Sequence, residues 1–208
     1  MYSMQRVLLI LFSFLITLSS FAQEGDSQFI HKYLLRADAS IVAGYMYKEG
    51  FNTVSVNGNL EYYIDSKVSI RGDCKYLLGC SGLTSDTLRL KDNHSILLGT
   101  VFHFKTTSHF DPYFILQPGF AYTSSYKAAG TTGADQTTIV TNYKPVISPL
   151  GTAGLGFNYY FPRFAHLFVE TRYVFGNHLS EASKPLSLQE LRITFGLGFN
   201  LFVMKEKK

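Results

Sequence analysis

Apolar and polar residues alternate one by one along much of this chain. The clearest rows run over 54–63, 67–78 and 190–201; in the first of them Val54 and Val56 alternate with polar neighbours. Strict alternation over about ten residues predicts a β-strand with one apolar and one polar face. A helix would need apolar spacings of three and four, which these segments lack.

Five weaker rows complete a set of eight strands. They cover 36–47, 96–104, 114–122, 147–161 and 167–175. Each is near the length of about 9–11 residues that a tilted strand needs to cross the hydrocarbon core of a bilayer. We therefore predict an all-β fold, an eight-stranded antiparallel up-and-down transmembrane β-barrel over 34–202.

Short and long connections alternate between the predicted strands. Three are tight (64–67, 105–109 and 162–165), and three are long and rich in Ser, Thr, Gly and Lys (81–92, 126–144 and 177–189). Outer-membrane barrels have short periplasmic turns and long extracellular loops. The alternation predicts that both termini are periplasmic, although the first outer connection, 48–52, is short.

The first 22 residues predict a cleaved signal peptide. Arg6 precedes an apolar core over 7–18, and Ser20-Phe21-Ala22 forms a small-x-small cleavage site. The apolar run is shorter than the roughly 20 residues of a membrane-spanning helix. The remaining predicted parts are a short periplasmic segment over 23–33 and a charged periplasmic tail over 203–208.

Composition supports contact with lipid. Charged residues make up 16% of the chain, against about 25% in soluble proteins. Aromatic residues make up 15%, all of them Tyr and Phe, and such rings favour membrane interfaces. No dense basic patch is present apart from the tail, so a nucleic-acid partner is not expected.

Two closed barrels could explain eight alternating strands. In a soluble lipocalin-like barrel the apolar rows point inward, and in a membrane barrel they face lipid. Tyr and Phe near the strand ends, together with Gly and opposite charges in the polar rows, favour the membrane barrel. The predicted interior network then consists of Arg36, Asp38, Glu61, Arg71, Asp73, Lys75, Glu170, Arg172, Glu190 and Arg192.

Five of these ten residues are basic and five are acidic. Buried charges are tolerated when they are paired and hydrogen-bonded, and the interior of an eight-stranded barrel is just wide enough for side chains to fill it. We therefore expect a plugged, salt-bridged interior and no wide diffusion pore.

Several local motifs resemble a known family. They are the Ala22-Gln23 signal boundary, Asp111-Pro112-Tyr113 at the start of the fifth strand, and the Gly-x-Gly-Phe repeats at 154–157 and 196–199. With them the chain resembles the small OmpA/OmpX-like barrels, in particular the porin-family "outer membrane protein beta-barrel domain" chains of Bacteroidota. The resemblance implies an outer-membrane location in a Gram-negative cell envelope.

The last strand also resembles a barrel-assembly signal. Thr194, Gly196, Phe199 and Leu201 occupy its positions, although Leu201 stands where an aromatic residue is usual. The resemblance thus implies the barrel-assembly machinery as a partner during insertion. Outer-membrane lipid, lipopolysaccharide and an unknown extracellular partner of the loops complete the expected partners, and we expect a monomer.

Three functions are compatible with these features. The first is a non-enzymatic structural or interaction role, in adhesion or envelope integrity, through the long loops. The second is a lipid-A-modifying hydrolase with His178 as base, Ser180 as nucleophile and Glu190 orienting the imidazole. Only His-x-Ser of that family's motif is present, and parity places Glu190 on the interior row. The third is a narrow channel for small solutes, against which the charged interior argues.

Cysteine and histidine indicate no metal site or cofactor. On one extended strand Cys74 and Cys80 would lie roughly 20 Å apart, so a disulfide would need a sharp bend between them; both a bridge and two free thiols stay open. The other histidines are interpreted as ordinary turn or interfacial residues: His31, His94, His103, His109 and His166.

Overall fold

The computed structural model describes residues 29–82, 88–104, 109–132, 137–161, 165–179 and 186–201. Their strands are β1 (Leu35–Met46), β2 (Phe51–Tyr63), β3 (Val68–Ser81), β4 (Leu88–His103), β5 (Phe110–Thr132), β6 (Thr137–Asn142), β7 (Val146–Tyr160), β8 (Ala165–Gly176) and β9 (Glu190–Leu201). No helix long and apolar enough to span a bilayer occurs within these ranges. The predicted signal peptide over 1–22 and the tail over 203–208 lie outside them.

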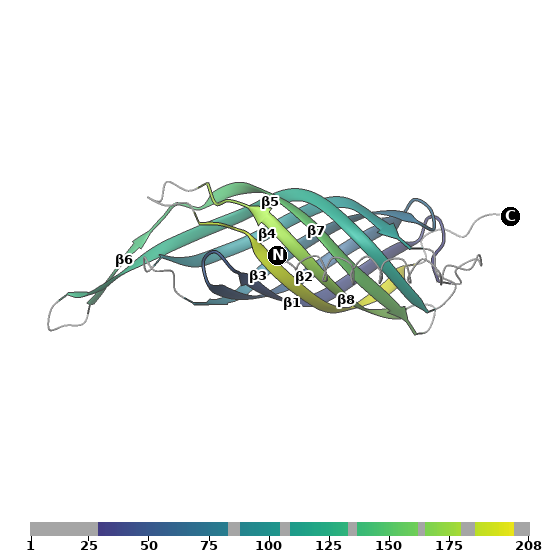
Figure 1. Ribbon diagram of the computed structural model, residues 1–208, viewed down its shortest axis with the longest axis horizontal. Coiled ribbons are helices and arrows are strands. Elements are labelled where there is room, and N and C mark those ends of the chain that lie inside the picture. The colour runs from purple at the N-terminus through teal and green to yellow at the C-terminus, as the bar shows by residue number, and fades with distance from the viewer. Residues whose placement is uncertain are drawn as a thin grey trace, which may run out of the picture.

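Eight of these strands form one closed antiparallel barrel (Figure 1). Sequence neighbours pair around the wall, except that β5 pairs with β7, and β9 returns to pair with β1. Pairing of β4 with β5 closes the remaining side. The predicted fold class, an eight-stranded antiparallel barrel, is confirmed.

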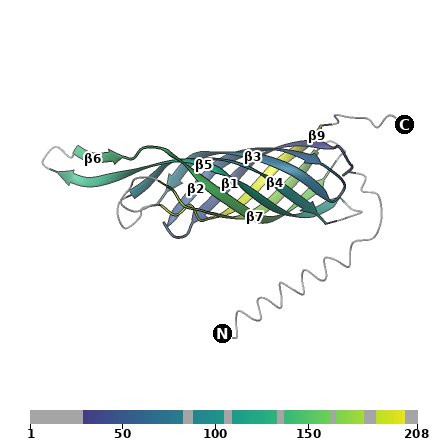
Figure 2. The same ribbon diagram turned by 90° about the horizontal axis from the view of Figure 1, so that it is seen from above.

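The ninth strand lies outside the barrel wall. β5 continues beyond its barrel partners and forms a hairpin with β6, which projects from one end of the barrel in both views (Figures 1 and 2). The sequence predicted a long connection over 126–144 and gave no indication of the strand pairing within it. Its Thr-, Ala- and Gly-rich residues show no apolar alternation, so their backbone pairing left no periodic signal.

The two ends of the barrel differ. At one end, here called the terminal end, Leu35 pairs with Leu201. At the other, the hairpin end, β5 and β6 project. At the terminal end the turn between β2 and β3 is stabilised by Asp65, whose Oδ1 accepts the backbone N–H of Lys67 at 2.7 Å and of Val68 at 2.8 Å. These two bonds hold the pKa of Asp65 below its ordinary value.

The residues of each strand form two faces with opposite environments. In β2 and β9 buried and exposed residues alternate without a break, as the period of two requires. Two bulges interrupt the pattern at the hairpin end. Val54 pairs with Gly79 but Ser55 with Leu77, so Leu78 is the extra residue in β3; likewise Lys91 is extra in β4.

Apolar side chains cover the outer wall. Ile96 is 67% exposed and Phe120 63% exposed, and many other large apolar side chains are exposed with them. A soluble protein rarely exposes such a large continuous apolar surface, because surfaces of this kind mark interaction sites. Aromatic residues form two exposed bands. The hairpin-end band contains Tyr45, Tyr47, Tyr76, Tyr122, Tyr173 and Phe175, and the terminal-end band contains Tyr62, Phe102, Phe104, Phe110, Tyr159 and Phe161.

Candidate functional site: the barrel interior

The interior of the barrel is polar in its middle and apolar at both ends. All ten residues of the predicted charge network are buried inside it: Arg36, Asp38, Glu61, Arg71, Asp73, Lys75, Glu170, Arg172, Glu190 and Arg192. They come from β1, β2, β3, β8 and β9, whose inward rows meet because the barrel closes. Their ion pairs form three groups along the axis.

The first group lies nearest the terminal end. Arg36 Nη2 donates to Glu61 Oε2 at 2.5 Å, and Arg36 Nη1 donates to Tyr160 Oη at 2.9 Å. The other oxygen of Glu61 lies 2.9 Å from His103 Nε2, and His103 Nδ1 lies 3.1 Å from Asp111 Oδ1. One chain of contacts therefore joins β1, β2, β4, β5 and β7.

The second group lies in the middle of the barrel. Arg71 Nη1 donates to Glu170 Oε2 at 3.1 Å, and Arg172 Nη2 donates to Asp73 Oδ1 at 3.0 Å. Gln117 supports the second pair, because its amide donates to Asp73 and its carbonyl accepts from Arg172. Arg172 Nε also donates to Glu170, which joins the two pairs. The group crosses the interior of the barrel from β3 to β8.

The third group lies toward the hairpin end and is more loosely made. Glu190 accepts from Arg192 Nε at 2.8 Å and from the hydroxyl of Thr53. Lys75 Nζ approaches Glu190 Oε2 only to 3.8 Å, and it has no hydrogen-bond partner among the described residues. Lys75 is therefore held by one long ion pair.

Three ionisable residues that contact the network were missed by the sequence analysis, His103, Asp111 and His166. His103 and Asp111 are buried in the interior, and the interpretation of His103 as a turn or interfacial histidine was wrong. Both ring nitrogens of His103 lie near carboxylates, and only the protonated imidazolium carries an N–H on each nitrogen that it can donate. His103 then balances Asp111, and the positive and negative charges of the buried network stay equal in number.

His166 was also misinterpreted as a turn or interfacial residue. It is fully buried, with Nε2 3.2 Å from Asp38 Oδ1. The signal for both histidines was parity, since His103 stands in the row opposite Phe102 and Phe104. The sequence analysis assigned the outward residues of that strand and did not follow the inward row to its end.

Glycines of the inward rows provide space for the network. A Cβ at Gly156 would lie 2.5 Å from the ring of Tyr113, and one at Gly154 would lie 2.7 Å from the carbonyl oxygen of Thr171 and 2.8 Å from Arg172 Cγ. Contacts below 3 Å cannot be accommodated without movement. The glycines of the Gly-x-Gly repeat over 154–156 therefore follow from crowding around the central charges.

Apolar clusters close the interior at each end. At the terminal end Phe29, Ile30 and Leu34 pack against Tyr63 and Tyr160, and the rings of Phe29 and Tyr160 stack at 5.2 Å. At the hairpin end the cluster contains Met46, Phe51, Leu77, Leu90, Leu97, Ala121, Leu150, Val174, Leu186 and Leu188. The charged middle is thus separated from both mouths of the barrel.

The hydrolase candidates do not form a catalytic arrangement among the described residues. His178 Nδ1 is bonded to the hydroxyl of Thr123, whereas Glu190 is bonded to Thr53 and Arg192. Burial lowers the pKa of His178. Ser180 lies outside the described residues. The structure therefore does not bring Glu190 to the imidazole that it was expected to orient.

The residues of the possible assembly signal divide between the two faces of β9. Thr194 and Gly196 are buried in the interior, and Phe199 and Leu201 are exposed on the outer wall. Leu201 is the last residue of β9 and pairs with Leu35.

Both cysteines are free thiols. Cys74 lies on the outer face of β3, and the bulge at Leu78 turns Cys80 toward the interior, where it packs against the hairpin-end apolar cluster. The two thiols therefore lie on different faces of the wall, which excludes a bridge in this structure.

A closed antiparallel barrel of eight strands, with charges inside and apolar residues outside, defines the fold of the small outer-membrane β-barrels. Neisserial surface protein A has this fold, with a TM-score of 0.55 at 14% identity over 81% of this chain and 97% of that chain. OprG from Pseudomonas aeruginosa gives 0.58 at 12% identity over 85% and 99%, respectively. Ail, the attachment invasion locus protein of Yersinia pestis, gives 0.50 at 11% identity over 82% and 99%.

No family model matches the chain, and no curated protein matches it. The likeness to the three solved structures is one of fold.

Proposed function

We propose that this chain is a non-enzymatic integral protein of the bacterial outer membrane, with a structural or interaction role at the cell surface. The outer wall supports the membrane location, because its exposed apolar belt lies between two aromatic bands as lipid-facing barrels require. The terminal end then faces the periplasm and the hairpin end faces outward. The motif resemblance extends the proposal to an OmpA/OmpX-like barrel of the Bacteroidota type.

A closed interior is the second part of the proposal. Its support is the central group, in which Arg71 of β3 and Arg172 of β8 both contact Glu170 across the interior. Planar-bilayer recording of the refolded chain should therefore give no large, stable open current. Steady conductance that survives high salt would contradict the closed interior.

The observation that carries the interaction role is the β5–β6 hairpin. β6 pairs with β5 on one side, and its other edge has no strand partner within the described residues. Exposed strand edges accept an added strand from another chain through backbone hydrogen bonds. The residues of β6, TTIVTN, carry no charge that would oppose such pairing.

Shortening the hairpin tests this role. A variant in which residues 128–140 are replaced by a two-residue Asn-Gly turn joins the partners Lys127 and Thr141 and keeps the barrel strands. The intact chain in the same cells is its control. Bacteria that display the intact chain should adhere to a host-cell or matrix surface more strongly than bacteria that display the variant. Equal adhesion across the surfaces that bind the intact chain would refute the hairpin as the interaction surface.

The remaining partners follow from the location. Outer-membrane lipid and lipopolysaccharide contact the outer wall, the barrel-assembly machinery acts during insertion through the last strand, and the chain works as a monomer. Fractionation of the outer membrane, followed by extraction with and without detergent, tests the location. A mature chain that stays folded and dissolved without detergent would contradict it.

A further inference from the structure

The wall of the barrel is discontinuous between β3 and β4 at the hairpin end. Their ladder runs from Val68–Phe102 to Lys75–Ser95, and no backbone pairing between the two strands continues beyond it in the described residues. β3 nevertheless extends to Ser81 and β4 begins at Leu88. The two strands diverge where each contains a bulge, because bulges bend a strand and increase its twist.

Side chains replace the missing backbone contacts along this seam. The backbone N–H of Leu77 donates to His94 Nδ1 at 3.2 Å. On the outer face the ring of His94 stacks on Tyr76 at 4.2 Å and lies 6.4 Å from Tyr122. Both tyrosines belong to the hairpin-end aromatic band, so the seam opens at the level where lipid chains give way to head groups.

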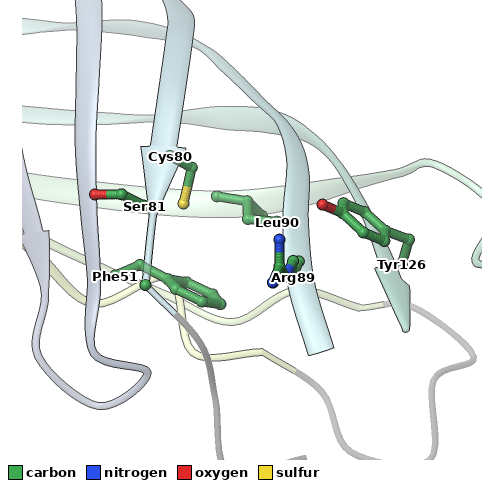
Figure 3. A pocket seen from close by; sticks show the side chains of 7 residues that line it. Phe51, Cys80, Ser81, Arg89, Leu90 and Tyr126 are labelled. Atoms are coloured by element: carbon green, nitrogen blue, oxygen red, sulfur yellow. The ribbon is translucent and has the colours of Figure 1, made fainter. Parts of the chain in front are cut away.

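A cavity of about 420 Å³ lies at the seam. It is lined by Phe51, Cys80, Ser81, Gly82, Arg89, Leu90 and Tyr126. Figure 3 shows Cys80 and Leu90 pointing toward one another between β3 and β4. The volume falls within the range of small-molecule sites, roughly 300–1,000 Å³.

The lining has an apolar floor and a cationic rim. Phe51 and Leu90 belong to the hairpin-end apolar cluster, and Cys80 packs against it. Arg89 is exposed at the rim and has no carboxylate within 4 Å among the described residues. A guanidinium beside an apolar cavity is complementary to a molecule with an anionic head and a hydrocarbon tail.

We propose that this cavity binds the tail of a free single-chain carboxylate amphiphile, such as a medium-chain fatty acid, which enters through the β3–β4 seam. Its carboxylate pairs with Arg89 at the interface, and its alkyl chain lies between Cys80 and Tyr126, against the buried apolar cluster that contains Phe51 and Leu90. The charge network below the apolar cluster stops the tail from passing further. The site therefore binds its ligand from the membrane side and does not form a channel.

The chain contains no Trp, which allows a single-reporter experiment. Tyr126→Trp places one fluorophore in the cavity wall. Tyr47→Trp places one in the aromatic band beside Tyr173, directly after the end of β1 and outside the cavity lining. The full mature chain is refolded into phosphatidylcholine vesicles and titrated with 12-bromododecanoate, whose bromine quenches Trp on contact. Quenching in the Tyr126→Trp variant should saturate. The bromododecanoate concentration at which it saturates should be at least about tenfold lower than the concentration that gives the same quenching in the Tyr47→Trp variant.

Two further variants assign the tail and the head. In the Tyr126→Trp background, Cys80→Phe fills the cavity and should weaken the saturable quenching at least about tenfold. Arg89→Gln should weaken binding of the carboxylate about tenfold, since a hydrogen bond to a charged group is lost, and should leave 12-bromododecanol unchanged. Lys91→Gln, an exposed neighbour outside the lining, is the matched control and should alter neither.

Quenching that rises without saturation and equally in both reporters would overturn the proposal, because it would report only probe dissolved in the bilayer. Equal loss of the carboxylate and the alcohol with Arg89→Gln would overturn the assignment of the head group. Heat-modifiable mobility in gels checks that Cys80→Phe is folded. If it is not, Arg89→Gln still decides, because an exposed side chain can change without loss of the fold.

Discussion

Removing one carboxylate from the central group should destabilise the barrel far more than removing it together with its arginine. Glu170 accepts from Arg71 at 3.1 Å and from Tyr113 at 2.9 Å, and all three are buried. Glu170→Gln keeps the side-chain size and deletes the charge. Arg71 and Arg172 then retain Asp73 as their one carboxylate within 4 Å among the described residues.

The expected magnitudes follow from burial. Breaking a buried pair from one side costs about 3–5 kcal/mol, because the other charge stays uncompensated. Arg71→Gln should cost a similar amount for the same reason. Replacing both members of a buried pair by neutral groups is often close to neutral, so the double variant should fall short of the additive sum by at least about 2 kcal/mol.

Equilibrium unfolding by guanidinium in the presence of phospholipid vesicles, followed by far-UV circular dichroism, measures the three free energies. Lys91→Gln, at an exposed position, serves as the control and should stay within about 0.5 kcal/mol of the parent. A double variant whose loss equals the sum of the single losses would refute the coupling. Single variants that lose less than about 1 kcal/mol would refute the assignment of these charges to a desolvated interior.

Three further measurements test other parts of the interior. Gly196→Val should destabilise the barrel by about 1–3 kcal/mol, because even a Cβ there would lie 2.5 Å from Phe168 Cε1. Gly58→Ala is its control, since a Cβ at Gly58 would meet nothing nearer than 3.9 Å. Equal losses of stability in the two variants would contradict the crowding around Gly196. Lys75→Met should change the unfolding free energy by less than about 1 kcal/mol, since the buried ammonium has no described hydrogen bond to lose. A loss of stability as large as that of Arg71→Gln would contradict this and show that the contact between Lys75 and Glu190 is strong. Burial lowers the pKa of His178, so its contribution to stability should be complete above its ordinary value of about 6.5 and should decrease as pH falls below it. The His178 amide donates to the Leu186 carbonyl, and its protection factor against hydrogen exchange should therefore fall in acid for the parent and less so for His178→Asn; identical pH profiles of the protection factor would contradict this.

The alternation of side chains was sufficient to predict the barrel and ten of the charged residues in its interior. A period of two assigns every inward position once one residue of a strand is placed, so Arg71, Asp73 and Lys75 could be assigned to the interior from β3 alone. The same parity would have placed His103 and Asp111, whose positions at strand ends obscured it. Parity fails at a bulge, since the extra residue Leu78 reverses the face on which Cys80 lies.

Partners within the interior could not be predicted, because they depend on closure. Parity gives the face of a side chain but not its height relative to strands far away in sequence. Glu190 illustrates the difference: its inward position was predicted, but its contacts with Thr53 and Lys75 follow from the register around the whole wall. The β5–β6 hairpin was not predictable for another reason, since its pairing is between backbone groups and leaves no apolar pattern.

Closure of the barrel and neutralisation of its interior depend on each other. Arg71 and Glu170 are separated by 99 residues, and Arg36 and Tyr160 by 124, so these contacts form only when the late strands have reached the early ones. A barrel that lacks β8 would hold Arg71 near one carboxylate instead of two in a medium where an unpaired charge is very costly. Partly closed forms are therefore unfavourable, because only the closed eight-stranded form brings the late carboxylates to the early arginines.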